Sequence, residues 1–478
     1  MLRSPDLYGP LLGKVLFPAF EAARGRPTVA MLRYLEQTQW WSADQLHDLQ
    51  SGLLRRLLRH AYDHTAHYRA VFDQLGAHPL DISSPAALQR LPLLTREVMQ
   101  ASQATRVADA PPFIAVRKFS SGTTGQPAEV AYNASSQHWR DAMRWRGYGW
   151  AGYRMGQRAL HYWGAAPIKP PVLKRLKVEL DHKLRRDLYV DANRRTPADL
   201  QRAVDVIRSY QPHVIVAYSQ GMATLARFIN ERGLRSWDTI PVLVGAERLW
   251  SHDREAIEQA FGPALFETYG CREFMLIGSE CENHDGMHTS METLIVEIVV
   301  QNADGSTRPA EPGEAGDVVV TDLQNLACPL IRVVSGDRAV ARPATPCTCG
   351  RGLQRIGPID GRVAETLFDG AGNATSGLIF SIMFVWLAKV TKQFQVVQRV
   401  DRSVVLRVVP VATTLSDADR AIARDYFAKY LPGATLEIAE VAEIPLEMAI
   451  QTLQARIVAA HLLAHEHRHA APAQGRFG

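Results

Sequence analysis

The sequence predicts an α/β protein, with one large domain and a smaller, mobile α+β domain at its C-terminal end. Length is the first observation, because 478 residues exceed what a single hydrophobic core usually supports. The second is that short β-rich segments alternate with longer helical patterns from about residue 112 to 330. The third is a distinct α+β pattern after residue 361. We therefore predict domains at residues 1–360 and 361–478.

The first predicted element is a helical cap on the large domain, at residues 30–76. This segment is rich in helix formers, and its leucines recur at helical spacing. The repeating residues are Leu46, Leu49, Leu53, Leu54, Leu57 and Leu58.

Strands and helices of the α/β region follow. The predicted strands are 214–219, 241–247, 294–300 and 317–323, and the clearest helical pattern is 196–210. In the smaller domain, strands are expected at 393–400 and 403–410 and a helix at 416–431. The apolar segment 378–388 is interpreted as buried core.

Composition excludes several classes of protein. The formal net charge of +5 is mild for this length, so a dedicated nucleic-acid binder is not expected. Mean hydropathy is -0.13, and no apolar run reaches the roughly 18 residues of a membrane span, so we expect no stable membrane insertion. Prolines interrupt the first 27 residues and no cleavage site follows, which favours a cytoplasmic protein.

Two segments leave a surface role open. A weak membrane-surface role remains for the N-terminal segment. The basic amphipathic stretch 173–187 could meet an acidic acceptor, a phosphopantetheine carrier or an anionic surface, or could be a solvated helix face.

The stretch "FSSGTTGQP" at 119–127 is the first candidate site. Glycine allows close approach of the backbone to a ligand, and Ser and Thr add hydroxyls beside exposed N–H groups, which together suit a phosphate. The Walker spacing is absent. Taken alone, the loop could also be an ordinary surface turn. Its predicted ligand-binding residues are Ser120, Ser121, Gly122, Thr123, Thr124 and Gly125.

Motifs further along the chain support the interpretation of this loop as a phosphate-binding loop. "SSGTTGQP" resembles the phosphate loop of the adenylate-forming (acyl-CoA synthetase-like) superfamily. The motifs that follow it in the expected order are "VGAERLW" (244–250), "ETYGCREF" (267–274), "PLIRVVSGDRAV" (329–340) and "IGPIDGRV" (356–363). Within the superfamily, "RYLEQTQWWS", "CTCGRG" and "TKQFQVVQ" are most similar to the phenylacetate-CoA ligase branch, particularly its capsular-polysaccharide (CapK-like) members. The resemblance covers about residues 30–450.

The resemblance implies a set of roles in carboxylic-acid activation by ATP. The phosphate loop would wrap pyrophosphate, and Glu273 would bind Mg²⁺. The other implied nucleotide contacts are Glu247 on the adenine side, Tyr269 and Gly270 near adenine, Asp337 at the ribose hydroxyls, and Arg362 at ribose or phosphate. Each of Tyr269, Asp337 and Arg362 also has a simpler interpretation, as a core, turn or solvated residue.

The acyl pocket is predicted from the segments between these motifs. If the analogy holds, Trp163, Tyr218 and Gly245 would line it, and the two aromatic residues would suit a flat or aromatic acid. Trp163 could equally be a core residue.

The five cysteines do not form a disulfide framework, but four residues suggest a structural zinc site. Cys281 and His288 stand in C-x6-H, and Cys347 and Cys349 stand in C-x-C. His284 competes with His288 as the nitrogen ligand, and buried free thiols remain the alternative. Cys271 and Cys328 are interpreted as packing residues.

Three departures from the family pattern matter for function. Gln126 stands where the phosphate loop usually has lysine, and Arg272 occupies a hydroxyl position, where it could itself meet phosphate. Most seriously, "IPLEMAIQ" places Gln451 where the family's C-terminal lysine reaches the reacting carboxylate. Gln carries no charge, so part of the transition-state stabilisation is missing. The hinge pair is also altered, to Ala364 and Glu365.

Three functions remain open from the sequence. The first is an AMP-forming acid ligase of a biosynthetic pathway that passes the acyl group to coenzyme A, a carrier thiol, a sugar or an amine. Arg272, Lys389, Lys392 or Arg456 would then supply the missing charge. The second is a member that has lost adenylation and performs another acyl transfer, and the third is a nucleotide- or metabolite-binding subunit. A homodimer is left open.

Overall fold

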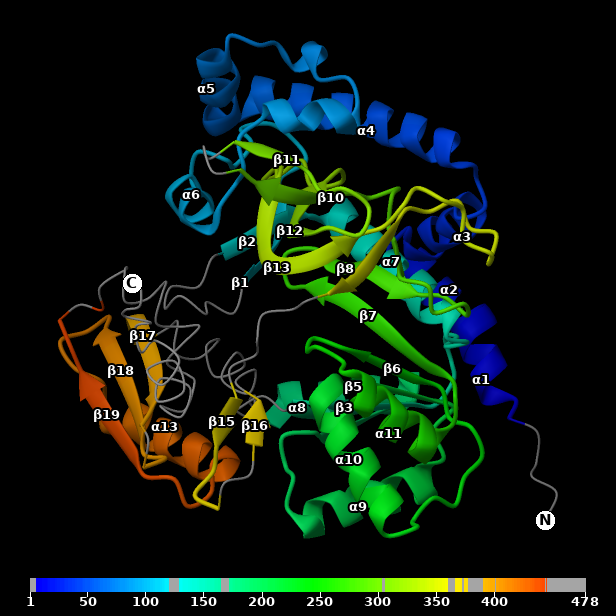
Figure 1. Ribbon diagram of the computed structural model, residues 1–478, viewed down its shortest axis with the longest axis vertical. Coiled ribbons are helices and arrows are strands. Elements are labelled where there is room, and N and C mark those ends of the chain that lie inside the picture. The colour runs from blue at the N-terminus through cyan, green and yellow to red at the C-terminus, as the bar shows by residue number, and fades with distance from the viewer. Residues whose placement is uncertain are drawn as a thin grey trace, which may run out of the picture.

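The protein is described from a computed structural model, shown in Figure 1. The structure describes residues 6–119, 129–164, 172–302, 306–359, 366–371, 374–376, 390–399, 401–442 and 444. The predicted phosphate loop, Gln126, Arg362, the hinge pair, Lys389, segment 378–388, Gln451 and Arg456 therefore lie outside the described residues. So does the predicted domain boundary at 360 and 361, which remains a prediction.

A twelve-stranded mixed sheet forms the large domain, which confirms the predicted α/β class. The strand order is β11-β10-β12-β13-β14-β9-β8-β7-β6-β5-β3-β4. The parallel part comprises β3 (Ala159–Trp163), β4 (Asp187–Asp191), β5 (Val214–Tyr218), β6 (Val242–Gly245) and β7 (Leu265–Cys271). The remaining strands are β8 (Met275–Glu280), β9 (Met287–Thr289), β10 (Leu294–Gln301), β11 (Thr307–Pro309), β12 (Ala315–Asp322), β13 (Val333–Ala341) and β14 (Arg355–Ile359).

At strand β7 the sheet changes from parallel to antiparallel pairing. This strand pairs in parallel with β6 and antiparallel with β8. Central parallel strands are buried on both faces, which explains the continuous apolar runs of β5 and β6. Helices α9 (Pro197–Tyr210), α10 (Ser219–Glu231) and α11 (Ser251–Phe261) supply apolar side chains to the core of this half of the sheet (Figure 1).

The N-terminal cap is helical, as predicted. Residues 30–76 form α3 (Thr28–Thr38), α4 (Ala43–His64) and α5 (Ala66–Leu75), and four of the six predicted leucines are buried. Ser42 and Gln45 form a capping box at the start of α4. Short helices η2 (Pro79–Asp81), η3 (Pro85–Arg90) and α6 (Arg96–Ala101) follow. The cap packs on the antiparallel half of the sheet through a core that includes Leu54 and Ile295.

An unpredicted helix precedes this cap. Helices α1 (Tyr8–Leu11), η1 (Leu12–Leu16) and α2 (Phe17–Ala23) are continuous, with a π-helical turn in the middle. Pro18 lies just after the π-helical turn, where the regular hydrogen-bond pattern of the helix is already interrupted. Among the described helices, none has both the length and the hydropathy needed to cross a membrane.

The C-terminal region has a sheet and core of its own. Strands β17 (Thr391–Gln398), β18 (Val404–Pro410) and β19 (Leu436–Glu440) form the sheet, and α13 (Asp417–Tyr430) packs on it. These elements match the predicted ones to within two residues at each end. Two further pairs of strands are β1 (Ile114–Phe119) with β2 (Glu129–Asn133) and β15 (Thr366–Phe368) with β16 (Ala374–Ser376). Helices α7 (Ala134–Trp150) and α8 (Val172–Arg185) complete the large domain.

Candidate active site and metal centre

The predicted pocket residues lie where neighbouring parallel strands end. Trp163 ends β3, Tyr218 ends β5, Gly245 ends β6, and Arg272 directly follows β7. Glu247 comes two residues after β6. Ligands of open α/β sheets bind outside the carboxyl ends of parallel strands, at the point where the strand arrangement changes. The topology thus places these residues together at the carboxyl ends of the parallel strands, next to β7, where the pairing changes from parallel to antiparallel.

Trp163 and Tyr218 form an aromatic pair. Their ring centroids lie 4.0 Å apart with an interplanar angle of 32°. Tyr218 is buried, and burial together with the Glu247 carboxylate raises the pKa of its hydroxyl, so the phenol is neutral at pH 7. The pair provides a flat apolar wall with a polar tip.

Gly245 has a packing role that the sequence did not indicate. A Cβ at this position would lie 2.5 Å from Thr268 Oγ1 and 2.8 Å from the Thr268 carbonyl oxygen. Only glycine allows β6 and β7 to approach this closely here. Its role in an acyl pocket remains a prediction.

Glu247 is a buried carboxylate with one engaged oxygen. Its Oε2 accepts a hydrogen bond of 2.9 Å from the backbone N–H of Gln220 in the first turn of α10, and its backbone carbonyl accepts one of 2.9 Å from Ser219 Oγ. The other oxygen, Oε1, is buried without a hydrogen-bond partner in the described part of the chain. A buried acceptor without a partner is costly, so a ligand donor would be favoured at this atom.

A buried ion pair holds the tip of the β7–β8 hairpin. Arg140 of α7 forms a salt bridge of 2.8 Å with Asp322, and its Nη2 donates to the Glu273 carbonyl oxygen at 2.6 Å. Both partners of the salt bridge are almost fully buried. The sequence analysis missed Arg140 and Asp322, because no local pattern relates residues 182 positions apart.

Strand β2 lies against the same arginine. The Arg140 guanidinium carbon lies 4.3 Å from the ring centroid of Tyr132. Strands β1 and β2 are paired up to Phe119 and Glu129. Strands β1 and β2 flank the predicted phosphate loop, and β2 contacts Arg140 through Tyr132. Arg140 in turn holds the backbone of Glu273.

Tyr269 and Asp337 come together from β7 and β13. The Tyr269 hydroxyl lies 3.0 Å from Asp337 Oδ2 and 3.2 Å from Ser335 Oγ. The Tyr269 ring is buried in the core of the antiparallel half. Burial and the Asp337 carboxylate hold the Tyr269 pKa well above its usual value, so the hydroxyl remains a donor. Stacking of Tyr269 on adenine remains a prediction.

Gly270 and Cys271 are explained by packing. A Cβ on Gly270 would clash with the carbonyl oxygen of Met275 on the paired strand β8. Burial and the Glu273 carboxylate hold the pKa of Cys271 well above its usual value, and this thiol does not belong to the group of clustered metal-ligand atoms described below.

Four residues form what we call the cysteine–histidine cluster: Cys281, His288, Cys347 and Cys349. Their ligand atoms all lie within 4.8 Å of one another. The sheet brings the two halves together, because His288 of β9 pairs with both Ser279 of β8 and Arg355 of β14. The C-x6-H and C-x-C halves therefore lie together in the fold.

Distances in the cluster suit a tetrahedral ion. Cys281 Sγ and Cys347 Sγ are 3.8 Å apart, and Cys349 Sγ is 3.3 Å from His288 Nε2. Zn–S bonds of about 2.3 Å at tetrahedral angles place sulfurs about 3.8 Å apart. His288 Nδ1 lies 3.0 Å from the Leu353 carbonyl oxygen, so this nitrogen donates and Nε2 faces the thiols.

The competing histidine, His284, lies outside the cluster. Its Nδ1 lies 3.1 Å from Glu280 Oε2. Glu273 and Cys281 stand at opposite ends of β8, roughly 20 Å or more apart at the rise of a strand. The cluster therefore has a structural position, not a catalytic one.

Comparisons with known proteins agree with this architecture. No family model matches the chain. The phenylacetate-coenzyme A ligase of Pseudomonas putida is 29% identical over 340 residues, which cover 70% of this chain and 74% of that protein. The enzyme of the same name from Thermus thermophilus is 25% identical over 382 residues, covering 77% and 81%.

Solved structures show the same fold. The chain superposes on 2-hydroxyisobutyryl-CoA ligase, in complex with 2-HIB-AMP and CoA, with a TM-score of 0.57 and 18% identity, covering 90% of this chain and 94% of that one. An open conformation of the same ligase gives a TM-score of 0.52. The large and small domains of the adenylate-forming ligases thus describe the fold of this chain.

Proposed function

We propose that this chain, a homologue of the phenylacetate-coenzyme A ligases, activates a carboxylic acid with ATP and passes the acyl group to coenzyme A. In the first step a carboxylate oxygen would bond to the α-phosphorus of ATP, and the bond to the pyrophosphate oxygen would break. In the second, the thiol sulfur would bond to the acyl carbon, and AMP would leave with the electron pair of the broken acyl–oxygen bond. Positioning two anions and neutralising charge are the main demands of such chemistry.

One observation carries this proposal. Tyr218, Glu247 and Arg272 lie at the carboxyl ends of β5, β6 and β7, where the sheet changes from parallel to antiparallel. Arg272 would supply positive charge beside the phosphates, and the free Oε1 of Glu247 would accept a donor of the bound nucleotide.

Glu273 and Asp337 would hold the remaining parts of the nucleotide. Glu273 would ligate Mg²⁺ together with phosphate oxygens, since Mg²⁺ takes carboxylate and phosphate ligands. Arg140 would fix its backbone for this task. Asp337, oriented by Tyr269, would accept the ribose hydroxyls. The phosphate loop and Arg362 keep the roles that the resemblance implies.

For the acid we propose a flat or aromatic carboxylate. The Trp163–Tyr218 pair would pack against such a group, because aromatic rings favour offset or tilted contacts with other rings. A carrier thiol, a sugar or an amine in place of coenzyme A remains an alternative acceptor.

The cysteine–histidine cluster is proposed to hold a structural Zn²⁺. Three thiolates and one imidazole form a standard tetrahedral ligand set, and the separations between them fit. Bound there, the ion would stabilise the loop between β13 and β14. That loop also contacts the N-terminal cap, because Arg351 Nε donates to Gln39 Oε1 at 3.2 Å.

The glutamine at position 451 favours a second candidate function, acyl transfer without adenylation. Without the lysine, the chain could perform an acyl transfer from a preformed adenylate or thioester, because losing one charged donor costs about 10²-fold to 10³-fold in rate.

The test is acid-dependent exchange of pyrophosphate into ATP, measured over a panel of carboxylic acids. We expect exchange in the wild type, a loss of about 10²-fold or more in Glu273→Gln, and no change in Glu255→Ala, on the outer helix α11. AMP binding is followed by calorimetry in parallel. Binding without exchange in the wild type, with exchange gained in Gln451→Lys, would establish the second candidate instead.

A further inference from the structure

The N-terminal helix 8–23 packs on the protein through glycines. A Cβ on Gly13 would clash with the Met155 carbonyl oxygen, and one on Gly9 would lie 2.9 Å from the Gly156 carbonyl oxygen. These two glycines are four residues apart and share one face. The inward face of the helix thus carries two glycines in its first half, with Phe17 and Glu21 buried further along it.

Four large apolar residues of the N-terminal segment face outward, whereas Phe17 is buried. They are Leu7, Leu11, Leu16 and Phe20, with exposed fractions from 43% for Phe20 to 76% for Leu7. Their spacing of four, five and four residues fits the π-helical turn at Leu12–Leu16, which adds one residue to a turn and keeps them on one side. Amphipathic helices of globular proteins normally do the reverse and bury such residues.

Helix α8 shows the same pattern more strongly. Its leucines recur every three or four residues and form one stripe, with exposed fractions from 52% for Leu184 to 81% for Leu173. They are Leu173, Leu176, Leu180 and Leu184. No side chain that the structure describes on α8 is buried. The leucines of this four-turn helix thus form an apolar stripe that is exposed and not packed into a described core.

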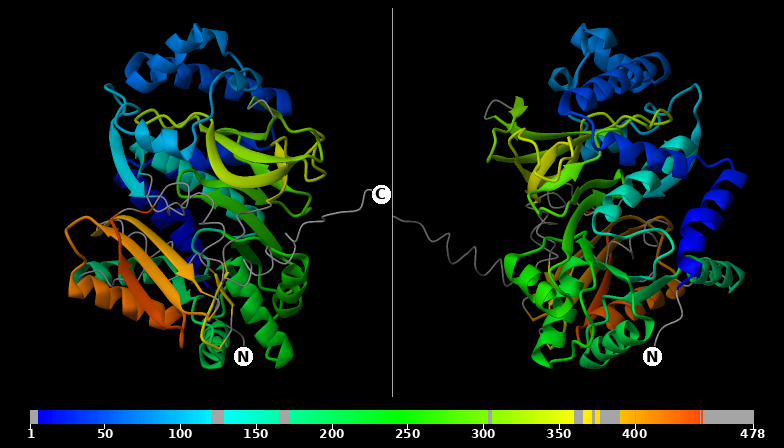
Figure 2. Two further views of the ribbon diagram at one scale, coloured as in Figure 1. Left: turned by 60° about the vertical axis from the view of Figure 1, so that its left-hand side comes forward. Right: turned by 90° about the vertical axis from the view of Figure 1, so that its right-hand side faces the viewer.

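The two helices are neighbours at the edge of the molecule. The Tyr8 hydroxyl donates to the Leu184 carbonyl oxygen at 2.9 Å, and the Arg185 guanidinium lies 5.6 Å from the Phe17 ring centroid. The right-hand view of Figure 2 shows both at the periphery. We call these eight outward residues, four on each helix, the exposed leucine surface.

Positive charge surrounds this surface. Helix α8 carries five Lys or Arg residues against Glu179 and Asp181. Lys14, Lys177 and Lys183 are exposed, and no described residue forms an ion pair with them. The charge is therefore available to an external anionic partner.

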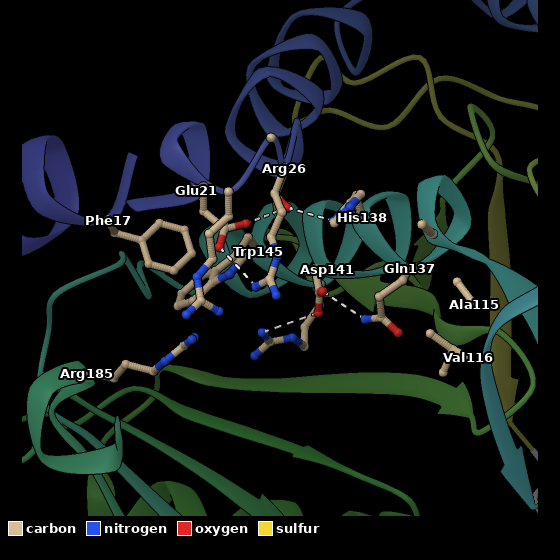
Figure 3. A pocket seen from close by; sticks show the side chains of 15 residues that line it. Phe17, Glu21, Arg26, Ala115, Val116, Gln137, His138, Asp141, Trp145 and Arg185 are labelled. Atoms are coloured by element: carbon tan, nitrogen blue, oxygen red, sulfur yellow. Dashed lines mark hydrogen bonds and ion pairs between the residues drawn. The ribbon is translucent and has the colours of Figure 1, made fainter. Parts of the chain in front are cut away.

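A basic cavity opens beside the same helices. It has a volume of about 610 Å³ and lies between α2, α7, β1 and the end of α8. Four arginines line it, against Glu21 and Asp141: Arg24, Arg26, Arg144 and Arg185. Figure 3 shows Arg26 and Arg185 reaching toward the same space from different elements. Such a cavity suits phosphate groups.

We propose that the exposed leucine surface docks the protein on a membrane leaflet that contains anionic lipid. Leucine and phenylalanine beside Lys and Arg, on helices lying at the surface, are what interfacial binding requires. The leucines would enter the acyl boundary while the lysines and arginines meet lipid phosphates. A second copy is a poorer occupant, because two such surfaces would bring like charges together. The proposal does not depend on acid activation.

Flotation of the full-length protein with lipid vesicles tests this. We expect binding to vesicles of phosphatidylcholine with about 30% phosphatidylglycerol, weak binding to pure phosphatidylcholine, and weakening as salt rises. Leu176→Glu/Leu180→Glu should lower partition to anionic vesicles at least about tenfold. Lys177→Glu/Lys183→Glu should lower it comparably on anionic vesicles only.

A matched variant controls for the added charge. Leu75→Glu/Leu80→Glu changes two leucines of the N-terminal cap, and Leu80 is 57% exposed against 58% for Leu180. This variant should bind as the wild type does. Failure of the wild type to float, or an equal loss in both leucine variants, overturns the proposal. So does a concentration-dependent dimer that Leu176→Glu/Leu180→Glu abolishes while vesicle binding stays unchanged.

Discussion

The Tyr430 hydroxyl of α13, in the C-terminal region, lies 3.0 Å from Asp191 Oδ2 at the carboxyl end of β4 in the large domain. Lys429 Nζ is 3.1 Å from the same oxygen. Tyr430 is buried, and the Asp191 side chain is nearly so. These contacts tie the small domain to the edge of the sheet at which the candidate site lies.

Asp191→Ala should loosen this attachment. Losing the ion pair and the hydrogen bond costs about 1 to 3 kcal/mol, which changes the population of docked domains by about fivefold to 150-fold. Energy transfer between fluorophores on α13 and α9 should fall. Glu437→Ala is the control, since it removes an ion pair of 2.7 Å with Arg399 inside the small domain. Equal transfer in Asp191→Ala and the wild type would contradict the prediction.

Tyr269→Phe should weaken nucleotide binding without removing a ligand group. The change deletes the hydroxyl that orients Asp337, and a hydrogen bond of this kind contributes about 1 kcal/mol. We expect AMP affinity to fall about fivefold by calorimetry, and further in Asp337→Ala. Tyr210→Phe serves as control, because it deletes a hydroxyl that donates to the Arg186 carbonyl oxygen at 2.6 Å outside the site. If both tyrosine variants lose affinity equally, Tyr269 acts only on stability.

The strands on which the candidate site residues lie could be predicted from the sequence, whereas the long-range contacts of those residues could not. Strand β5 was expected at 214–219 and spans Val214–Tyr218, so a local apolar run placed its first residue correctly and its last to within one residue. Arg140 was not found, because its link to Glu273 crosses 133 residues and leaves no local pattern. The choice between His284 and His288 likewise needed the register of β9.

The N-terminal helix was missed for a different reason. In the sequence, Pro10 and Pro18 indicate only the interruption of a hydrophobic segment, and prolines are in general poor predictors of a helix. Pro18, however, lies just after the π-helical turn at Leu12–Leu16, where the regular hydrogen-bond pattern is already interrupted. The outward leucines also gave no core signal, because the face that packs combines Gly9 and Gly13 with Phe17.

Zinc content should depend on the cysteine–histidine cluster. The purified protein is expected to contain one Zn²⁺ per chain by elemental analysis, and Cys349→Ala or His288→Ala should lower this toward zero. The thermal midpoint should fall by roughly 5 °C or more, because metal binding stabilises the folded state.

Two control variants test whether zinc binding depends on the four cluster residues alone. His284→Ala removes the neighbouring histidine, and Cys328→Ala removes a buried thiol outside the cluster. Both should retain the metal. Full zinc content in Cys349→Ala, or loss of zinc in His284→Ala, would show that the ligand set is wrong.

Glu267 on β7 should contribute a loss of stability as pH rises from about 4.5 to 7. Burial and the nearby Glu280 carboxylate raise the pKa of Glu267 to about 7, while Arg254 and Arg248 oppose the shift. Burial also disfavours ionisation of Glu280, but the His284 contact and the ion pair with Arg254 outweigh it and lower the Glu280 pKa. Glu280 therefore stays ionised and keeps Glu267 protonated.

Linkage gives the sign of this effect. The unfolded chain releases the Glu267 proton near the ordinary pKa of 4.5, whereas the folded chain keeps it until about pH 7. Over that window the folded state binds more protons, so the free energy of unfolding declines with rising pH, by about 1 to 3 kcal/mol for a partly buried group. Glu267→Gln removes the titrating group. It should raise the denaturant midpoint at pH 8 more than at pH 5, whereas Glu258→Gln, on the exposed side of Arg254, should change neither. Equal midpoint changes at both pH values would show that Glu267 is ionised in the folded protein.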